Sequence, residues 1–105
     1  AYGNYYGVLH EFKEIYKGDS LNLEKYFYKG LVYLELYQFQ SAIENFTKIL
    51  LIKNNKYSDE SRWYLGLCYL KIGQKLKAKN YFEEILNMQR YKRNEAREIL
   101  QKIKM

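Results

Sequence analysis

Few residues of this chain could carry out catalysis or bind a metal ion. His10 is the single histidine and Cys68 the single cysteine, so no zinc site can be assembled from Cys and His ligands. Nothing near His10 in the sequence supplies a nucleophile or an orienting carboxylate arrangement. Cys68 falls in an apolar stretch beside Tyr69, where burial disfavours the reactive thiolate. We therefore expect a structural role for Cys68 and no metal site.

Paired carboxylates are a second possible source of chemistry. Glu83 is followed directly by Glu84, and Glu11 lies three residues before Glu14. Acid–base catalysis needs two carboxyl groups that face one cleft in different environments, whereas these pairs have the spacing of solvated helix faces. The chain also lacks a glycine-rich phosphate loop, a metal-binding helix motif and a strand–turn–helix nucleophile site. The sequence therefore predicts a non-catalytic protein that needs no cofactor.

The composition predicts one folded domain. The chain has 105 residues, of which 48% are hydrophobic and 18% aromatic, and this is enough apolar surface to offset the entropy lost on folding. No run of apolar residues is long enough for a membrane span, and no signal peptide is found. Because the chain begins with Ala1 rather than Met, we expect a piece of a longer protein, in which a membrane tether could lie upstream.

Positive charge is concentrated towards the C-terminus. The net charge is +6, and residues 1–70 are balanced while residues 71–105 carry 10 basic against 4 acidic side chains. Such an excess can attract nucleic acid or another anionic surface, or it can be the solvated face of the last helices. The spacing is no tighter than on an ordinary surface, which favours the solvated face. The alternative, an anionic-partner patch, would use Lys75, Lys77, Arg90, Lys92 and Arg93.

The elements that would position these residues form an internal repeat. Gly30 and Gly66, each followed by a leucine, a tyrosine and a second leucine at matching positions, coincide at an offset of 36 residues. The same offset relates Ala42 to Ala78, Phe46 to Phe82 and Ile49 to Ile85. Partial copies at an offset of 34 lie upstream and downstream, at Val8, Phe12 and Ile15 and at Ala96, Ile99, Leu100 and Ile103. Such a period is typical of a repeat architecture.

Apolar residues within each copy recur every three or four positions, which is the period of a helix with one buried face. Gly73 and Asn54–Asn55 interrupt this pattern, and Ser58 before two acidic residues predicts a helix start. Because the connections are short, neighbouring helices should be antiparallel, and the chain should be a stack of helical hairpins. We expect six helices, over residues 4–16, 22–36, 39–53, 59–72, 75–89 and 94–104.

These features resemble the tetratricopeptide repeat (TPR) family. The second copy has the family's apolar, small and aromatic residues at the family's spacing, in Leu65, Gly66, Tyr69, Ala78, Phe82 and Ile85. The first copy matches through Gly30, Tyr33, Ala42, Phe46 and Ile49. Departures are Lys29, where an apolar residue is usual, and Asn54 and Arg90, where the family often ends a repeat with proline. The resemblance implies an all-α, antiparallel helix-hairpin stack, which is a TPR-like α-solenoid.

The resemblance covers nearly the whole chain and implies a single TPR-like domain over residues 1–105. We expect a half repeat at 4–16, full repeats at 23–56 and 59–91, and a capping helix at 92–105 with a polar outer face. The run from Arg62 to Leu67 is also similar to bacterial TPR proteins that are tethered near a membrane. This second resemblance implies a bacterial protein, either cytoplasmic or tethered at the cell envelope.

The TPR family binds ligands in a concave groove that is lined by the first helix of each repeat. The resemblance implies that the groove positions of this chain are Glu24, Phe27, Leu31 and Leu34 in one copy and Glu60, Trp63, Leu67 and Leu70 in the other. Six of these side chains are large and apolar, which is more than a monomer normally exposes on one face. The Lys, Asn and Arg set with which some TPR domains hold a C-terminal carboxylate is missing from these positions.

We therefore expect a non-catalytic protein–protein interaction module. Its groove would bind an apolar or amphipathic peptide segment, most simply a helix, or would join copies of this chain in self-assembly. Internal burial, with the first and last helices covering part of the leucine ladder, stays open as an alternative. Nucleic acid or an anionic surface, bound through the basic C-terminal region, is the less favoured partner.

Overall fold

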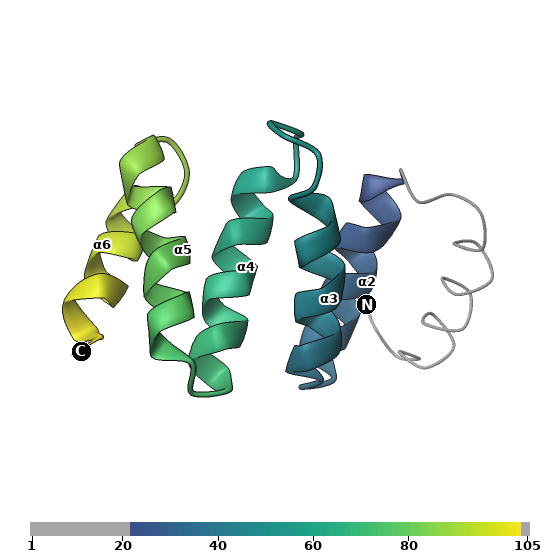
Figure 1. The fold of residues 1–105 in the computed structure, drawn as a ribbon, viewed down its shortest axis with the longest axis horizontal. Helices are drawn as coiled ribbons and strands as arrows, with labels where there is room; N and C mark the ends of the chain where they lie inside the picture. The colour runs from purple at the N-terminus through teal and green to yellow at the C-terminus, as the bar shows by residue number, and fades with distance from the viewer. Residues whose placement is uncertain (1–21, 104–105) are drawn as a thin grey trace.

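The computed structural model describes residues 22–103, and the predicted helix at 4–16 lies outside them. This part of the chain holds five α-helices and no strand, joined by turns (Figure 1). The helices are α2 (Leu23–Glu35), α3 (Phe39–Ile49), α4 (Ser58–Lys71), α5 (Lys75–Met88) and α6 (Arg93–Lys102).

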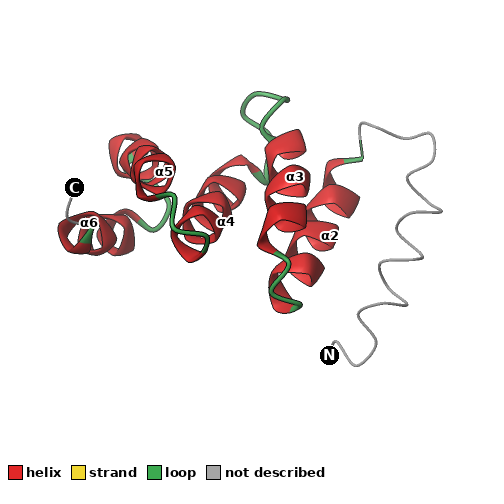
Figure 2. Ribbon diagram, turned by 60° about the horizontal axis from the view of Figure 1, so that its bottom comes forward, coloured by secondary structure: helices red, strands yellow, loops and turns green. Residues whose placement is uncertain are grey.

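The helices form an antiparallel stack in chain order. Each packs against the next one along the chain, α2 on α3, α3 on α4, α4 on α5 and α5 on α6. Figures 1 and 2 show this zigzag from two sides, with α3 and α5 in front of α2 and α6 in Figure 1. Because antiparallel neighbours alternate in direction, α2, α4 and α6 run the same way. The predicted all-α stack of helical hairpins is confirmed.

The hairpins pack closely because a phenylalanine ring lies against a helical glycine in each one. A Cβ atom built on Gly30 would lie 2.7 Å from Phe46 Cε1, and a Cβ atom on Gly66 would lie 2.7 Å from Phe82 Cζ. Both rings are fully buried. The small residues of the repeat therefore let α3 approach α2, and α5 approach α4, at a distance that only glycine permits.

Two core clusters result from this packing. The first core cluster joins α2, α3 and α4 through Tyr26, Phe27, Ala42, Ile43, Phe46, Ile49, Leu65 and Cys68. The second core cluster joins α5 and α6 through Ala78, Phe82, Ile85 and Ala96. Tyr69 packs against both clusters, so the two repeats share one continuous apolar interior.

A polar contact joins the two helices of each hairpin at the same register but with different chemistry. In the first copy, Lys48 Nζ lies 5.0 Å from the centre of the Tyr26 ring. At the equivalent positions of the second copy, Arg62 Nε donates to Glu84 Oε2 at 3.0 Å. The basic residue is on the second helix of the hairpin in the first copy (Lys48 on α3) and on the first helix in the second copy (Arg62 on α4). The position of the contact is thus retained, although the residues that make it differ.

Helix α3 ends earlier than the sequence pattern predicts, at Ile49 instead of residue 53. The Asn55 side chain explains this end, because its Nδ2 donates to the carbonyl oxygens of Ile49 and Ile52 at 2.9 and 2.8 Å. Asn54 has a left-handed φ of 55°, which stops helical continuation. The longer connection between α3 and α4 accounts for an offset of 36 residues between the copies.

Helix α4 begins where the sequence predicted a helix start, at Ser58. Tyr57 occupies the N-cap of α4, and Ser58 is the first helical residue. The Ser58 hydroxyl accepts a hydrogen bond from the backbone N–H of Asn55 at 3.1 Å, so it closes the preceding turn. Asp59 and Glu60 do lie in the first turn of α4, as expected.

Candidate functional site

The predicted groove positions lie on α2 and α4, the first helices of the two repeats. Because these helices run in the same direction, equivalent side chains follow one another in the same order along α2 and along α4. Along α2, Glu24 and Leu34 are about 15 Å apart. We call the surface that contains Glu24, Leu31, Leu34, Glu60, Trp63, Leu67 and Leu70 the groove face.

Phe27 does not belong to this surface, although the sequence predicted it there. Its side chain is only 5% exposed. The Tyr57 ring stacks on it at 4.8 Å between centroids, and the Tyr64 ring lies 6.1 Å away. Both tyrosines come from the next repeat, so Phe27 joins α2 to α4. Phe27 is therefore buried inside the protein and is not available to a ligand, as the alternative of internal burial predicted for part of the groove.

Trp63, the equivalent of Phe27 in the second copy, keeps part of its surface exposed. Its ring meets Phe82 edge to face at 5.4 Å, just as Phe27 meets Phe46 at 5.9 Å. Above Trp63, however, lies the ammonium group of Lys92, 5.2 Å from the ring centroid. A lysine can move aside more easily than two packed tyrosines, so Trp63 is the more accessible aromatic residue.

The four leucines of the groove face are all partly exposed. Leu31 and Leu34 pack against the first core cluster, and Leu67 and Leu70 pack against the second. One side of each leucine thus contributes to the core while the other side faces outwards. Glu24 is exposed and Glu60 partly exposed in the first turns of their helices. The groove face is therefore apolar along most of its length and acidic at one end.

The apolar surface does not continue onto α6. At an offset of 34, the positions equivalent to those on α4 hold Asn94, Arg97 and Gln101, and all three are exposed. Arg97 Nη1 donates to Asn94 Oδ1 at 3.4 Å. In α6, Leu100 also stands where Gly30 and Gly66 stand in the two copies, so a second helix could not approach it as closely. The capping function of this helix stays a prediction.

The acidic end of the groove face carries a tyrosine with an altered acidity. Burial, together with the neighbouring charges of Glu60, Asp59 and Glu95 and the Tyr64 phenol, raises the pKa of Tyr91 to about 12. Tyr91 also lies under Lys92, whose Nζ is 5.6 Å from its ring centroid. The Tyr91 hydroxyl therefore stays protonated at neutral pH and can act as a hydrogen-bond donor.

The five residues of the predicted anionic-partner patch are not brought together. Lys75 and Lys77 lie in the first turn of α5, whereas Arg90, Lys92 and Arg93 follow its last turn. The length of α5 separates the two groups by about 20 Å. Arg90 is further occupied by Asp59, which accepts hydrogen bonds from its Nε at 2.7 Å and its Nη2 at 3.0 Å. This arrangement gives no continuous basic strip.

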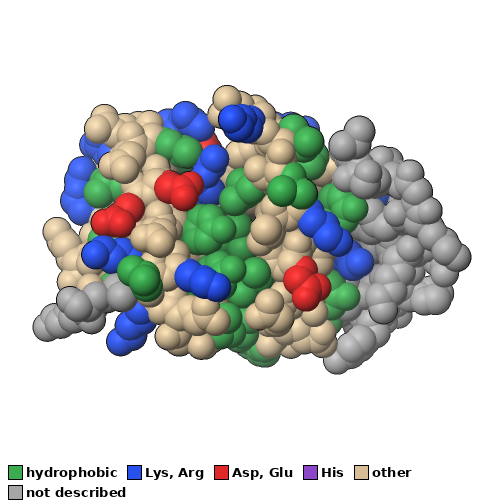
Figure 3. Space-filling model, viewed as in Figure 1, with side chains coloured by type: hydrophobic (Ala, Val, Ile, Leu, Met, Phe, Trp, Pro, Cys, Tyr) green, Lys and Arg blue, Asp and Glu red, His purple; other side chains and the backbone are tan. Residues whose placement is uncertain are grey.

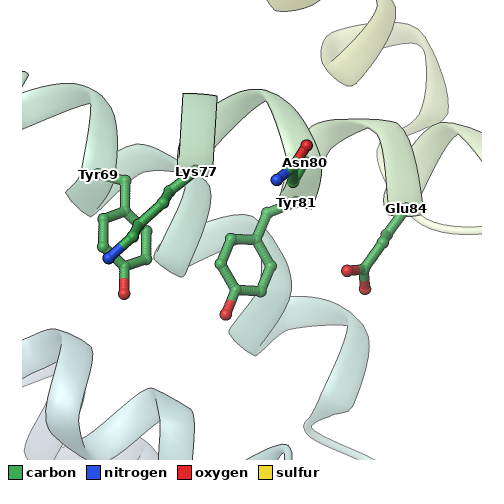
Figure 4. A pocket seen from close by; sticks show the side chains of 5 residues that line it. All are labelled: Tyr69, Lys77, Asn80, Tyr81 and Glu84. Atoms are coloured by element: carbon green, nitrogen blue, oxygen red, sulfur yellow. The ribbon is translucent and has the colours of Figure 1, made fainter. Parts of the chain in front are cut away.

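A pocket between α4 and α5 was not predicted. It has a volume of about 320 Å³ and is lined by Tyr69 from α4 and by Lys77, Asn80, Tyr81 and Glu84 from α5 (Figure 4). Lys77, Tyr81 and Glu84 are spaced by four and three residues, so they share one face of α5. This spacing on α5, together with the tyrosine that recurs at positions 33 and 69, was the sequence signal that could have predicted the pocket.

Cys68 is the single cysteine of the chain, and it is buried. Burial raises the pKa of the Cys68 thiol to about 11, so the thiolate is scarce at neutral pH. Within residues 22–103, no three His, Cys, Asp or Glu side chains are grouped so that they could hold a metal ion. None of the helices in this part of the chain is long and apolar enough to cross a membrane.

Together, the alternating antiparallel helices and the two equivalent Gly–Phe contacts define a helical-repeat protein. A family model described as tetratricopeptide repeat matches residues 60–89, which span most of α4 and all of α5. The predicted resemblance is confirmed over these residues, which form a tetratricopeptide repeat. Such repeats are protein–protein interaction modules and are typically non-catalytic. No curated protein matches the chain.

Proposed function

We propose that this chain is a non-catalytic module that holds an apolar or amphipathic segment of a protein partner on the groove face. The segment would lie across α2 and α4 and contact Leu31, Leu34, Leu67 and Leu70, with Trp63 at one end. The single observation that carries this proposal is the partial exposure of these five apolar side chains on two helices of the same direction.

The energetics favour an occupant for this surface. Fully burying one leucine side chain is worth about 1.5 to 3 kcal/mol, so covering the remaining exposed part of four leucines and a tryptophan supplies a substantial driving force. Contiguous apolar surfaces on soluble proteins commonly mark interaction sites. An amphipathic helix fits such a surface because its apolar residues recur every three or four positions.

The acidic end of the groove face would set the orientation of the segment. Glu24 and Glu60 occupy equivalent positions, and among residues 22–103 neither carboxylate forms an ion pair with a lysine or arginine. A segment with its polar end towards Glu24 and Glu60 and its apolar end towards Leu34 and Leu70 would match this gradient. The segment belongs either to another protein or to a second copy of this chain.

The proposal is tested by selecting random peptides displayed on phage with the immobilised chain. The enriched clones are then measured on the Leu67→Glu variant and on the Leu51→Glu control. Leu51 is 76% exposed in the turn after α3 and lies outside the groove face. The Leu51→Glu variant therefore shows whether replacing any exposed leucine with glutamate weakens binding. Clones that lose binding only on Leu67→Glu support the proposal, whereas clones that bind both variants equally contradict it. Light scattering over a concentration series shows whether a second copy is the occupant.

A further inference from the structure

The pocket between α4 and α5 shares no lining residue with the groove face, and several hydrogen-bond donors line it. The Tyr69 and Tyr81 rings are nearly parallel, at an interplanar angle of 7° and a centroid distance of 5.9 Å. Figure 4 shows both hydroxyl groups directed to the same side of the pocket, with the Lys77 side chain beside Tyr69. Lys77 Nζ lies 5.4 Å from the centre of that ring.

None of these donors has a protein acceptor among the described residues. No hydrogen bond or ion pair within residues 22–103 involves the Tyr69 hydroxyl, the Tyr81 hydroxyl or Lys77 Nζ. The Asn80 amide, at the edge of the same pocket, is also without such a bond. Burial, the Tyr69 phenol and the Glu84 charge raise the pKa of Tyr81, so its hydroxyl remains a donor at neutral pH.

The one carboxylate that lines the pocket is already bound. Glu84 Oε2 accepts from Arg62 Nε at 3.0 Å, and Arg62 also reaches Asp59 Oδ1 at 3.2 Å. Glu84 thus already has a cationic partner, which it shares with Asp59. Lys77, in contrast, forms no ion pair with a carboxylate among residues 22–103. With Glu84 paired to Arg62 and Lys77 unpaired, the charges at the pocket favour a ligand that accepts hydrogen bonds and carries negative charge.

The location of the pocket suits a second contact with a protein partner. Tyr81 packs against the first core cluster, so the pocket faces the side of α5 nearest α3. Figure 3 shows hydrophobic side chains gathered over α4 between α3 and α5, with basic and acidic side chains along the margins. A volume of about 320 Å³ accommodates one side chain and not an extended segment.

We propose that this pocket binds a carboxylate, supplied by an aspartate or glutamate side chain of a partner protein. Lys77 Nζ pairs with the carboxylate, and the Tyr69 and Tyr81 hydroxyls donate hydrogen bonds to it. This contact is independent of the groove face, because none of its residues belongs to that face. Lys77 is exposed, and it thus acts together with two tyrosine hydroxyls and not as part of a basic patch.

Two capped tripeptides provide the probe, acetyl-Gly-Glu-Gly-amide and its isosteric control acetyl-Gly-Gln-Gly-amide. Each is titrated into the ¹⁵N-labelled chain while the NMR signals of the Asn80 side-chain amide and the Lys77 and Tyr81 backbone amides are followed. We expect saturable shifts with the glutamate peptide, and affinity weaker by about 10-fold with the glutamine peptide, since one charge-assisted contact is lost.

Three variants separate the pocket from general charge attraction. Tyr69→Phe with Tyr81→Phe keeps both rings and removes only the hydroxyls, and Lys77→Met keeps the aliphatic stem without the charge. Each should weaken the glutamate peptide by about 10-fold, while the Lys75→Met control should leave it unchanged. The proposal is overturned by equal binding of both peptides, by the absence of saturable shifts, or by shifts that survive in these variants. An equal loss in Lys75→Met also overturns it, because it would show that the peptide responds to the general positive charge of this region and not to the pocket.

Discussion

The Phe82 ring lies so close to Gly66 that a Cβ atom at position 66 would meet Phe82 Cζ at 2.7 Å. The same relationship joins Gly30 and Phe46, at the same distance to Cε1. Both rings are fully buried and have no room to retreat. The distance between the two helices of each hairpin is therefore set by a glycine on one helix and a phenylalanine on the other.

Gly66→Ala should therefore destabilise the fold, although alanine is the better helix former. The gain in helix propensity is about 1 kcal/mol, whereas forcing an extra carbon into a packed core costs about 1 to 3 kcal/mol. We expect a net loss of up to about 2 kcal/mol in the free energy of unfolding, measured by urea denaturation. Phe82→Leu should reduce this loss in a double-mutant cycle. A more stable Gly66→Ala variant would show that the Gly–Phe contact does not limit the packing.

Tyr37→Gly should stabilise the chain. Tyr37 and Gly73 occupy equivalent turns with φ values of 58° and 81°, and in both turns the next residue donates to a carbonyl oxygen five positions back, at 2.9 and 2.8 Å. This is the Schellman end of a helix, which favours glycine. Tyr37 is 79% exposed and loses little packing, so we expect a gain of about 0.5 to 1 kcal/mol.

The reverse change serves as its control. Gly73→Tyr places a side chain at a left-handed position and should lower stability by about 1 kcal/mol in the same thermal or urea melts. If both substitutions change stability in the same direction, the turn conformation is not what decides their effect.

Ser61→Ala should also raise stability. Ser61 is fully buried, and among residues 22–103 its hydroxyl oxygen has no hydrogen-bond partner, which is a cost that alanine removes. Alanine also has the higher helix propensity. We expect a gain of about 1 kcal/mol, which raises Tm by about 4 to 8 °C in a domain of this size.

Ser58 provides a matched comparison because it is equally buried but satisfied. Its hydroxyl accepts from the Asn55 N–H at 3.1 Å, so Ser58→Ala should lower stability by about 1 kcal/mol. A stabilising Ser58→Ala, or a destabilising Ser61→Ala, would show that hydrogen-bond satisfaction does not control these two sites.

Alkaline pH should weaken the fold through Cys68. Its pKa is about 11 in the folded chain against 9.0 for a free thiol. The unfolded chain therefore releases this proton first, and the slope of stability with pH becomes negative above pH 9. The contribution is fully present below pH 9 and is lost as the pH rises towards 11. Cys68→Ala should flatten the decline between about pH 9 and pH 11 in urea melts, and tyrosine titration, which occurs in both chains, cancels in the comparison. An identical decline in both chains would contradict this account.

The fold could be predicted largely from the sequence because the repeat is carried by packing residues. Gly66, Phe82 and their counterparts recur at a fixed offset, since each hairpin needs the same small and large residues at the same contact. The end of α3 could not be predicted in this way. It depends on Asn55 turning its side chain back onto two carbonyl groups, and the apolar period does not record such a local hydrogen bond.

The candidate site was less predictable, for a different reason. Phe27 and Trp63 occupy equivalent positions, but their exposure depends on what the next repeat places above them, two tyrosines in one case and Lys92 in the other. Similarly, Lys77 was predicted as part of a charge patch, and its neighbours Tyr69 and Tyr81 came from the packing of α4 on α5. Contacts between repeats are not visible in the pattern of one repeat.

Trp63 offers the most direct test of the groove face, because it is the single tryptophan of the chain. A peptide selected on the chain should shift its fluorescence emission to shorter wavelength on binding, since the peptide excludes water from the indole ring. The shift should saturate with the peptide, persist in Leu51→Glu, and disappear in the variant with Leu31→Glu and Leu67→Glu. Peptide binding that leaves the Trp63 emission unchanged, or that survives in the double variant, would contradict the proposal that the groove face holds the partner segment.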